Sequence, residues 1–328
     1  MRAPIPLATN VVIFTGMLGL QLAQFLVIPF LPSPWAWALV LTSASTTTLW
    51  ALMHEAIHNH LFPGKWNRLA GVTLATVFGS SFSFLQRGHL THHSVNRTPV
   101  EQLEILRPKE TPMMAAAIYY VFLAGGLYLA EVVLPFLFWL PKSWNVIGKL
   151  KIGEFGELLL SKLNSAEAIR RIRVETLLVV GFFSVSVWLY RDRLELLAAV
   201  LAARALLISA LDYIYHYETP VGDPTHAMDL WLPPWLSAFI LHFNCHHAHH
   251  LHPSLPWNTL PQLAHPSMSW WKAAARAWKG PLQRDQIPEA DVCPKTVLGK
   301  RRQRGTSTPS PATSNNADIS RSISRASP

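Results

Sequence analysis

Histidines gather in three short segments of this 328-residue chain, and nine of its fifteen histidines lie there. Cluster 1 is residues 54–58 (HEAIH), cluster 2 is residues 89–93 (HLTHH) and cluster 3 is residues 246–250 (HHAHH). Neutral imidazole is the commonest side-chain metal ligand near neutral pH. Imidazoles grouped in this way predict a metal site, and their number predicts more than one ion.

The spacing within each cluster indicates a helix that presents its histidines on one face. His54 and His58 are four residues apart, and clusters 2 and 3 repeat spacings of three and four residues from their first histidine. Such side chains lie on the same side of a helix, so we expect the histidines of each cluster to converge on one point. With one further ligand, the clusters would supply about eight or nine nitrogens, which suits two ions better than one. Imidazole-rich ligation favours iron, copper or zinc.

The elements that carry the clusters are apolar and long enough to cross a membrane. The chain is 50% hydrophobic and only 14% charged, whereas a soluble domain carries about 25% charged residues. A membrane-spanning helix needs about 20 apolar residues. Segments 8–31 and 35–53 therefore predict one helical hairpin, and segments 174–190 and 194–215 predict a second. The predicted fold is an all-α integral membrane protein with about four transmembrane helices in two hairpins.

Two further apolar segments, 69–86 and 113–140, decide whether the clusters can share a site. If each segment crossed the membrane once, cluster 2 would lie on the opposite side from the other two clusters. We therefore expect both segments to lie in the membrane interface or to re-enter on the same side. Segment 141–173 contains seven Lys or Arg residues, so the positive-inside tendency places it, the histidine-rich cap and both termini on the cytoplasmic face.

Composition also limits the partners and the domain organisation. Residues 1–279 are expected to form one membrane-embedded domain, and residues 280–328 a basic, disordered tail with the run KRRQR at 300–304. A net charge of +9 would suggest nucleic acid in a soluble protein, but the basic residues lie in short loops and in the tail. An anionic membrane surface is the favoured partner, and no nucleic acid is expected. Two cysteines, Cys245 and Cys293, cannot build a disulfide framework.

The three clusters, in this order, resemble the membrane fatty acid desaturase superfamily, whose pattern is H-x(3,4)-H, H-x(2,3)-H-H and H-x(2,3)-H-H. The segment after cluster 3, which ends in Pro-x-x-Pro-Trp at Trp257, resembles the same family, and the resemblance covers roughly residues 35–262. It implies a further ligand, His216, on the helix before cluster 3. Asp212, one turn earlier, stands where some relatives carry asparagine. Its carboxylate could bind metal directly or through water, or could orient a neighbouring ligand, and the orienting role is preferred.

The resemblance implies a metal site, a reaction class and a partner. The implied metal ligands are His54, His58, His89, His92, His93, His216, His246, His249 and His250. The implied cofactors are two iron ions of a non-haem di-iron centre, with O₂ as co-substrate. The expected reaction is the introduction of a double bond into a fatty acyl chain by a fatty acid or acyl-lipid desaturase. The alternatives on the same scaffold are a lipid or carotenoid hydroxylase, a ketolase and a fatty acid decarboxylase.

Electrons must come from a separate protein of the ferredoxin or cytochrome b5 type. The sequence has no His-Pro-Gly-Gly haem motif, and it has too few cysteines for an iron–sulfur cluster. Arg87, Arg97, Arg107 and Lys109, near cluster 2, could dock an acidic donor, or they could be ordinary membrane-flanking charges.

Other classes of function account for less of the pattern. Cluster 1 also matches the HExxH motif of zinc metalloproteases, in which glutamate is the base. That interpretation leaves clusters 2 and 3 unexplained, and the Leu-Asp-Gly motif of intramembrane zinc proteases is absent from the sequence. A carboxylate di-iron site would need a second Glu-x-x-His, which the sequence also lacks. Four histidines lie off the matching spacings and are expected outside the metal site: His60, His242, His247 and His252. Cys245 is expected only to pack, and Trp257 to anchor the chain at the membrane interface.

Overall fold

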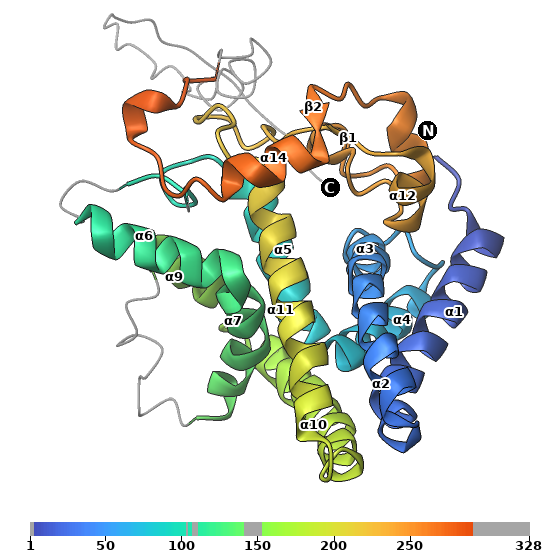
Figure 1. The fold of residues 1–328 in the computed structure, drawn as a ribbon. Helices are drawn as coiled ribbons and strands as arrows, with labels where there is room; N and C mark the ends of the chain where they lie inside the picture. Colours follow the sequence, from blue (N-terminus) through green and yellow to red (C-terminus); the bar gives the residue numbers. More distant parts are fainter. Residues whose placement is uncertain (1–2, 103, 107–110, 141–152, 291–328) are drawn as a thin grey trace, which may run out of the picture. The chain divides into compact units, whose positions relative to one another are not determined.

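The computed structural model describes residues 3–102, 104–106, 111–140 and 153–290 (Figure 1). Helices dominate this part of the chain. The helices are α1 (Leu7–Leu26), α2 (Ser33–Val40), α3 (Thr46–Ile57), α4 (Lys65–Phe78), α5 (Phe82–Val95), α6 (Pro112–Val121), α7 (Leu127–Val133), α9 (Gly153–Lys162), α10 (Ala166–Leu189), α11 (Leu194–His216), α12 (Pro234–Phe239), α13 (His246–Leu251) and α14 (Trp270–Ala277). Shorter helical turns are η1 (Ile28–Phe30), η2 (Leu41–Ser45), η3 (Phe122–Gly126), η4 (Leu134–Trp139), η6 (Trp257–Gln262) and η7 (Arg284–Gln286). Two parallel strands, β1 (Leu230–Trp231) and β2 (Met268–Ser269), pair Leu230 with Met268.

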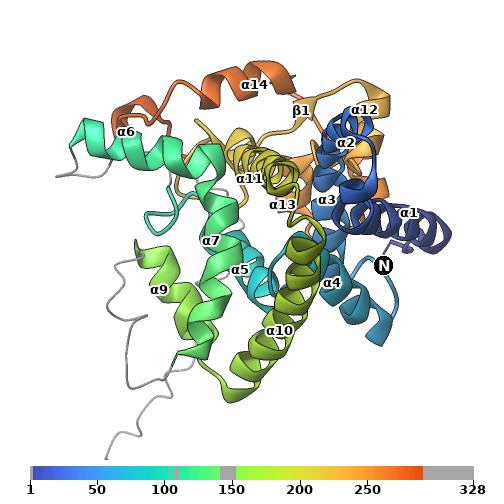
Figure 2. The ribbon, with the colours of Figure 1, turned by 60° about the horizontal axis from the view of Figure 1, so that its bottom comes forward.

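Both predicted helix pairs are present. Helix α1 is followed by the run Ser33–Ile57, and α10 is followed by α11; each of these four helices is long and apolar enough to cross a membrane. The turns of the two pairs lie side by side, because Tyr190 donates a hydrogen bond to the Gln24 carbonyl and Arg193 donates one to the Leu31 carbonyl. Figure 2 shows α11 between α7 on one side and α2 and α3 on the other.

The apolar segment 69–86 is broken into two helices. Helices α4 and α5 meet at an angle of 99°, which is the geometry of a broken span or a re-entrant loop. Gly79, with φ +106°, ends α4 in the left-handed conformation that glycine adopts most readily. Ser81 then caps α5 by accepting a hydrogen bond from the Phe84 amide. The sequence did not indicate this break, although it favoured re-entrant packing for the segment.

Segment Pro112–Trp139 also differs from a single straight helix. It is long and apolar enough to cross a membrane, so the described residues contain five candidate spans where the sequence predicted about four. The helix is kinked at Gly125, where φ is +143° and an added Cβ would lie 3.1 Å from the Ala205 Cβ. This close approach to α11 explains why the kink needs glycine. In Figure 1, α6 turns away from the direction of α7.

The main hydrophobic core joins α3, α4 and α11 with α14 above their ends, and it includes Leu52, Leu74, Ile214 and Ala277. Residues after α11, including α12 to α14, cover the same end of the helices.

The packed unit continues to Ala290, eleven residues beyond the expected boundary at residue 279. The reason is backbone pairing: the Leu282 amide donates to the Glu104 carbonyl, and the Ala290 amide donates to the Val221 carbonyl. The expected disorder of the remaining tail falls on residues outside the described part.

Candidate metal centre

The elements that bear the histidines bring these side chains together in one region of the protein. Cluster 1 lies at the end of α3, cluster 2 in the second half of α5, His216 at the end of α11, and cluster 3 in α13. The structure gathers all nine predicted ligands into two groups, and within each group one ligand atom per residue lies within 4.8 Å of the others. The five-histidine group is His54, His58, His89, His93 and His249, and the four-histidine group is His92, His216, His246 and His250.

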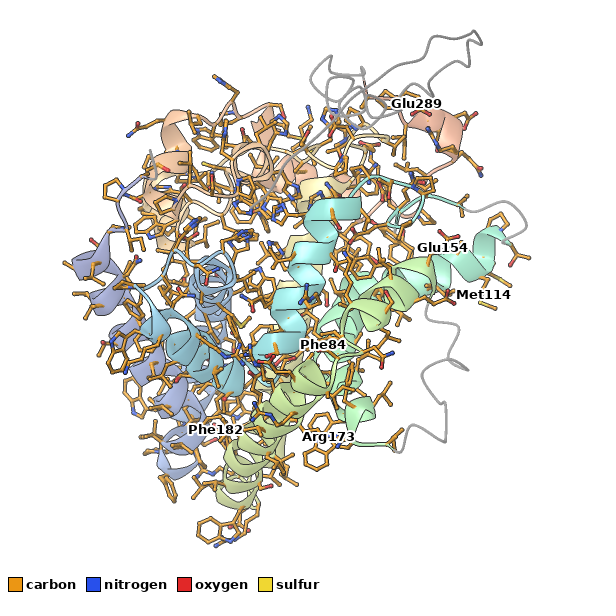
Figure 3. The ribbon with its side chains drawn as sticks, turned by 180° about the vertical axis from the view of Figure 1, so that it is seen from behind. Phe84, Met114, Glu154, Arg173, Phe182 and Glu289 are labelled. Atoms are coloured by element: carbon orange, nitrogen blue, oxygen red, sulfur yellow. The ribbon has the colours of Figure 1, made fainter. Side chains whose placement is uncertain are left out.

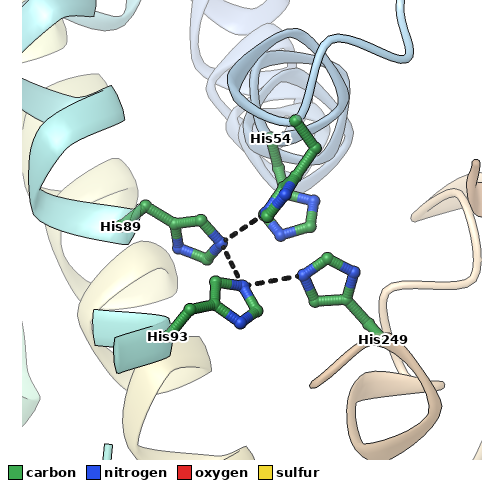
Figure 4. A group of neighbouring side chains, drawn as sticks. His54, His89, His93 and His249 are labelled. Atoms are coloured by element: carbon green, nitrogen blue, oxygen red, sulfur yellow. Dashed lines mark hydrogen bonds between the residues drawn. The ribbon is translucent and has the colours of Figure 1, made fainter. Parts of the chain in front are cut away.

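In the five-histidine group, ring nitrogens face one another at short distances. The Nε2 atoms of His58 and His89 are 3.1 Å apart, those of His89 and His93 are 3.0 Å apart, and those of His93 and His249 are 3.0 Å apart. Figure 4 shows His54, His89, His93 and His249 converging from α3, α5 and α13. The Nε2 atom of His54 is buried and has no hydrogen-bond partner among the described residues. Converging lone pairs with an orphaned nitrogen among them fit a shared cation.

In the four-histidine group, outer hydrogen bonds orient two of the rings. His92 Nδ1 lies 2.9 Å from Glu101 Oε1, and His250 Nδ1 lies 3.2 Å from the Pro224 carbonyl. Each contact leaves Nε2 directed inward, and His250 Nε2 is buried without a partner among the described residues. The Nε2 atoms of His216 and His246 are 3.2 Å apart. This is the arrangement by which proteins hold metal-binding histidines, with the outer nitrogen bonded to an oxygen.

Adjacent histidines of one cluster belong to different groups. In α5, His93 joins the five-histidine group and His92 the four-histidine group; in α13, His249 and His250 divide in the same way. Consecutive side chains on an α-helix diverge by about 100°, because the helix has 3.6 residues per turn. One point in space cannot take both members of such a pair. The expectation that each cluster converges on a single point is therefore wrong for clusters 2 and 3, which serve both groups.

Burial keeps four of the ligand histidines neutral. It lowers the pKa of His58 to about 3. Burial, assisted by the neighbouring imidazoles, also lowers the pKa values of His246, His249 and His250 well below the ordinary value. Only a neutral imidazole offers a nitrogen lone pair to a metal, so these four histidines present their nitrogens in the form that can bind.

Asp212 belongs to neither group. With His92, Glu101 and His216 it lines a small cavity of about 20 Å³, enough for one water molecule. Its carboxylate therefore stands beside the four-histidine group, at a position from which it can act through a water or through a neighbouring ligand. Arg97 borders the same cavity, is 1% exposed and forms a buried ion pair with Glu104.

The burial of Arg97 shows that it cannot dock an electron donor, so this part of the docking hypothesis is wrong. Arg87 is exposed. Arg107 and Lys109 lie outside the described residues.

Buried carboxylates fix the elements that carry clusters 1 and 3. Asp229 accepts hydrogen bonds from the amides of Ala248, in α13, and His265, at 3.1 and 2.9 Å. Glu55 of the HExxH motif accepts one from the Trp257 amide at 3.2 Å. The Trp257 indole donates to Asn10 of α1, at 2.9 Å. Trp257 therefore ties the segment after cluster 3 to α1, and its expected role as a membrane anchor stays a prediction.

The bend between α4 and α5 is held by charges from the second helix pair. Glu175 of α10 is buried and accepts hydrogen bonds from the Ser81 hydroxyl at 2.6 Å and the Ser83 amide at 2.7 Å. Arg204 of α11 is fully buried and donates to the Val77 carbonyl at 2.7 Å. A carboxylate at the start of one helix and a guanidinium at the end of another complement both helix dipoles. Figure 3 shows the ribbons of α5, with Phe84, and of α10, with Arg173 and Phe182.

Four of the six other histidines were expected outside the metal site, and these four, His60, His242, His247 and His252, belong to neither group. His242 Nδ1 lies 2.8 Å from the Ser237 hydroxyl, and His247 Nδ1 lies 3.2 Å from the Thr225 carbonyl.

Four supporting residues were missed by the sequence analysis: Glu101, Glu175, Arg204 and Asp229. Their charges inside apolar segments could have revealed Glu175 and Arg204, whereas Glu101 and Asp229 lie in loops without a distinguishing pattern.

Comparison with known proteins accounts for this arrangement. The sequence model of the family described as fatty acid desaturase matches residues 32–278, well over half of the chain. No match is found among curated proteins or among solved structures. Membership of this family implies an oxidoreductase associated with membranes, a lipid substrate and bound metal. The matched residues span all three histidine clusters and His216, and the chain belongs to the fatty acid desaturase family.

Proposed function

We propose that the protein is an O₂-dependent membrane di-iron oxidase that introduces a double bond into a fatty acyl chain. The observation that carries this proposal is the division of nine histidines into groups of five and four. The five-histidine group would hold one iron and the four-histidine group the other. Because α5 and α13 each contribute to both groups, the two ions would lie side by side. A zinc hydrolase needs only three protein ligands, so it would leave most of these histidines without a role.

The residues of the chain have three tasks in this reaction. When bound, a pair of irons supplies O₂ activation and hydrogen abstraction from an unactivated C–H bond. The histidines would hold both ions, six of them from buried and three from half-buried positions, which limits the access of bulk water. Glu101 fixes the ring of His92, and Asp212 is placed to orient a water or a neighbouring ligand beside the four-histidine group. The two electrons would come from a separate ferredoxin or cytochrome b5-type protein.

The proposed topology places the whole site on one face, which we assign to the cytoplasm. Tyr119 of α6 donates a hydrogen bond to the Ala277 carbonyl of α14, in the cap. Lys162, just before α10, donates to the Ser94 hydroxyl at 3.4 Å, next to His93. Segment 112–165 therefore begins and ends beside the histidine-bearing ends of the helices. An even number of crossings between these points keeps the three clusters on the same side, as one site requires.

Other oxidations on the same scaffold are the alternative. After hydrogen abstraction, loss of a second hydrogen gives an alkene, oxygen transfer gives an alcohol, and fragmentation next to a carboxylate gives a terminal alkene and CO₂. The position of the reacting carbon decides among a desaturase, a hydroxylase or ketolase, and a decarboxylase.

Two measurements on the expressed full-length chain test the proposal. Gas chromatography–mass spectrometry of host lipids should reveal new unsaturated acyl esters with wild type and with His252→Ala, but not with His249→Ala. His252 is the matched control because it is exposed and belongs to neither group. Mössbauer spectroscopy with elemental analysis should find two irons per chain. One zinc per chain and no oxidised lipid, with donor proteins supplied, would overturn the proposal.

A further inference from the structure

A large apolar groove lies in the membrane part of the protein, away from the histidines. Its volume is about 1130 Å³, and it lies between segment Val121–Phe136, the second half of α10 and the first half of α11. We call it the distal groove. Its walls include Val179, Phe183 and Val187 from α10 and Leu201 and Ala205 from α11. Apolar lining of this kind takes hydrocarbon and disfavours water.

The mouth of the distal groove has the residues of a membrane–water boundary. Trp188 and Arg191 line it, and the guanidinium of Arg191 lies 5.2 Å from the centre of the Trp188 ring. Both side chains are more than half exposed, at 62% for Trp188 and 58% for Arg191. Tryptophan is enriched at the level of lipid headgroups, and arginine binds phosphate with two hydrogen bonds. Asp192 forms an ion pair with Arg191, in which Asp192 Oδ2 lies 3.5 Å from Arg191 Nε, but this pair leaves the Arg191 side chain exposed.

The position of the distal groove separates it from the reacting centre. Its mouth lies at the turn between α10 and α11, whereas His216 lies at the opposite end of α11. Ala205 is eleven residues before His216, which is about 16 Å along an α-helix. A chain that enters from the mouth and ends near Ala205 would stop about 16 Å short of the level of this histidine. The groove therefore suits a resident lipid better than the chain that reacts.

We propose that the distal groove binds one phospholipid from the leaflet opposite the metal centre. Its acyl chains lie against α10 and α11, and its phosphate contacts Arg191. This assignment of the leaflet rests on the proposed topology. The inner end of the groove reaches Gly79 in the bend between α4 and α5, where an added Cβ would lie 3.4 Å from Phe183. The bound lipid thus packs against the bend from which cluster 2 is presented.

Native mass spectrometry of the full-length chain, purified in detergent and exposed to phosphatidylglycerol or phosphatidylcholine, tests this proposal. Wild type should retain one phospholipid. Ser184→Trp and Val180→Trp place an indole in the groove at exposed positions and should each weaken retention about tenfold or more. Val12→Trp is the matched control, because Val12 is 71% exposed on α1 and lies outside the groove. Arg191→Gln should weaken retention about threefold, the scale of an exposed ion pair.

The outcomes separate this proposal from the proposed enzymatic function. If Ser184→Trp and Val180→Trp retain as much lipid as wild type, the groove is not the lipid site and the proposal is overturned. The same follows if the Val12→Trp control loses as much lipid as these two variants. If neither wild type nor any variant retains lipid, side chains of the protein itself fill the groove. This result would also overturn the proposal. If the retained lipid is converted to product during turnover, the groove is the substrate site instead. Retention of unreacted lipid by a protein without oxidase activity would refute the enzymatic proposal alone.

Discussion

Replacing Glu175 is the sharpest test of how the metal centre is positioned. The side chain is 5% exposed, and its carboxylate accepts hydrogen bonds from Arg68, from the Ser81 hydroxyl, and from both the amide and the hydroxyl of Ser83. In a membrane interior, backbone amides at a helix start have no water to bind. We expect Glu175→Ala to leave these donors unpaired and to detach the start of α5 from α10.

The contacts give the magnitude. Removing one partner of a buried, hydrogen-bonded charge pair costs about 3–5 kcal/mol. Arg68 is 38% exposed and can regain water, so we expect the lower part of this range, about 3 kcal/mol, for Glu175→Ala. At about 2–4 °C for each kcal/mol, the melting temperature should fall by about 6–12 °C. Glu175→Gln keeps one acceptor oxygen and should lose about half as much, near 1.5 kcal/mol.

The assay is thermal unfolding of the iron-loaded protein in detergent, with iron counted per chain before heating. Glu167→Gln is the matched control: Glu167 lies on the same helix and pairs with Arg171, but both side chains are exposed, at 62% and 44%. This control should keep its melting temperature and its iron. Because cluster 2 contributes to both groups, Glu175→Ala should lose both irons together. An unchanged melting temperature in Glu175→Ala, or loss of only one iron, would refute the reasoning.

Three further results are expected. Asp229→Asn removes a carboxylate that holds the amide of Ala248, so iron per chain should fall while the helical circular dichroism stays near wild type. Removing iron with a chelator should lower the melting temperature of the wild-type protein, because metal binds only the folded state, and added ferrous iron should restore it. Asp212→Asn should retain two irons but alter the Mössbauer signal of one of them, since the side chain borders only the four-histidine group; a change at both irons would show that Asp212 acts more widely.

Much of the fold followed from apolar length. The helix pairs and the cap of histidines were predictable because each helix of a pair contains an apolar stretch long enough to cross a membrane. The break between α4 and α5 was not, because its local signals are modest: a glycine followed by two serines at residues 79–81. Besides these local signals, Glu175 and Arg204, about a hundred residues away in sequence, satisfy the helix ends at this turn. Contacts of this range leave no trace in local periodicity.

The site was predictable in its members but not in its division, although the division follows from helix geometry. His89 and His93 are four residues apart, so both face the five-histidine group, and His92, turned by about 100° from His93, must face elsewhere. In α13 the roles are exchanged, because the pair four residues apart, His246 and His250, faces the four-histidine group. The adjacent pairs His92–His93 in α5 and His249–His250 in α13 therefore link the two groups rigidly, each through consecutive residues of one helix. A shift of either helix must move a ligand in both groups, which is why the carboxylates that hold α5 and α13 matter to both ions at once.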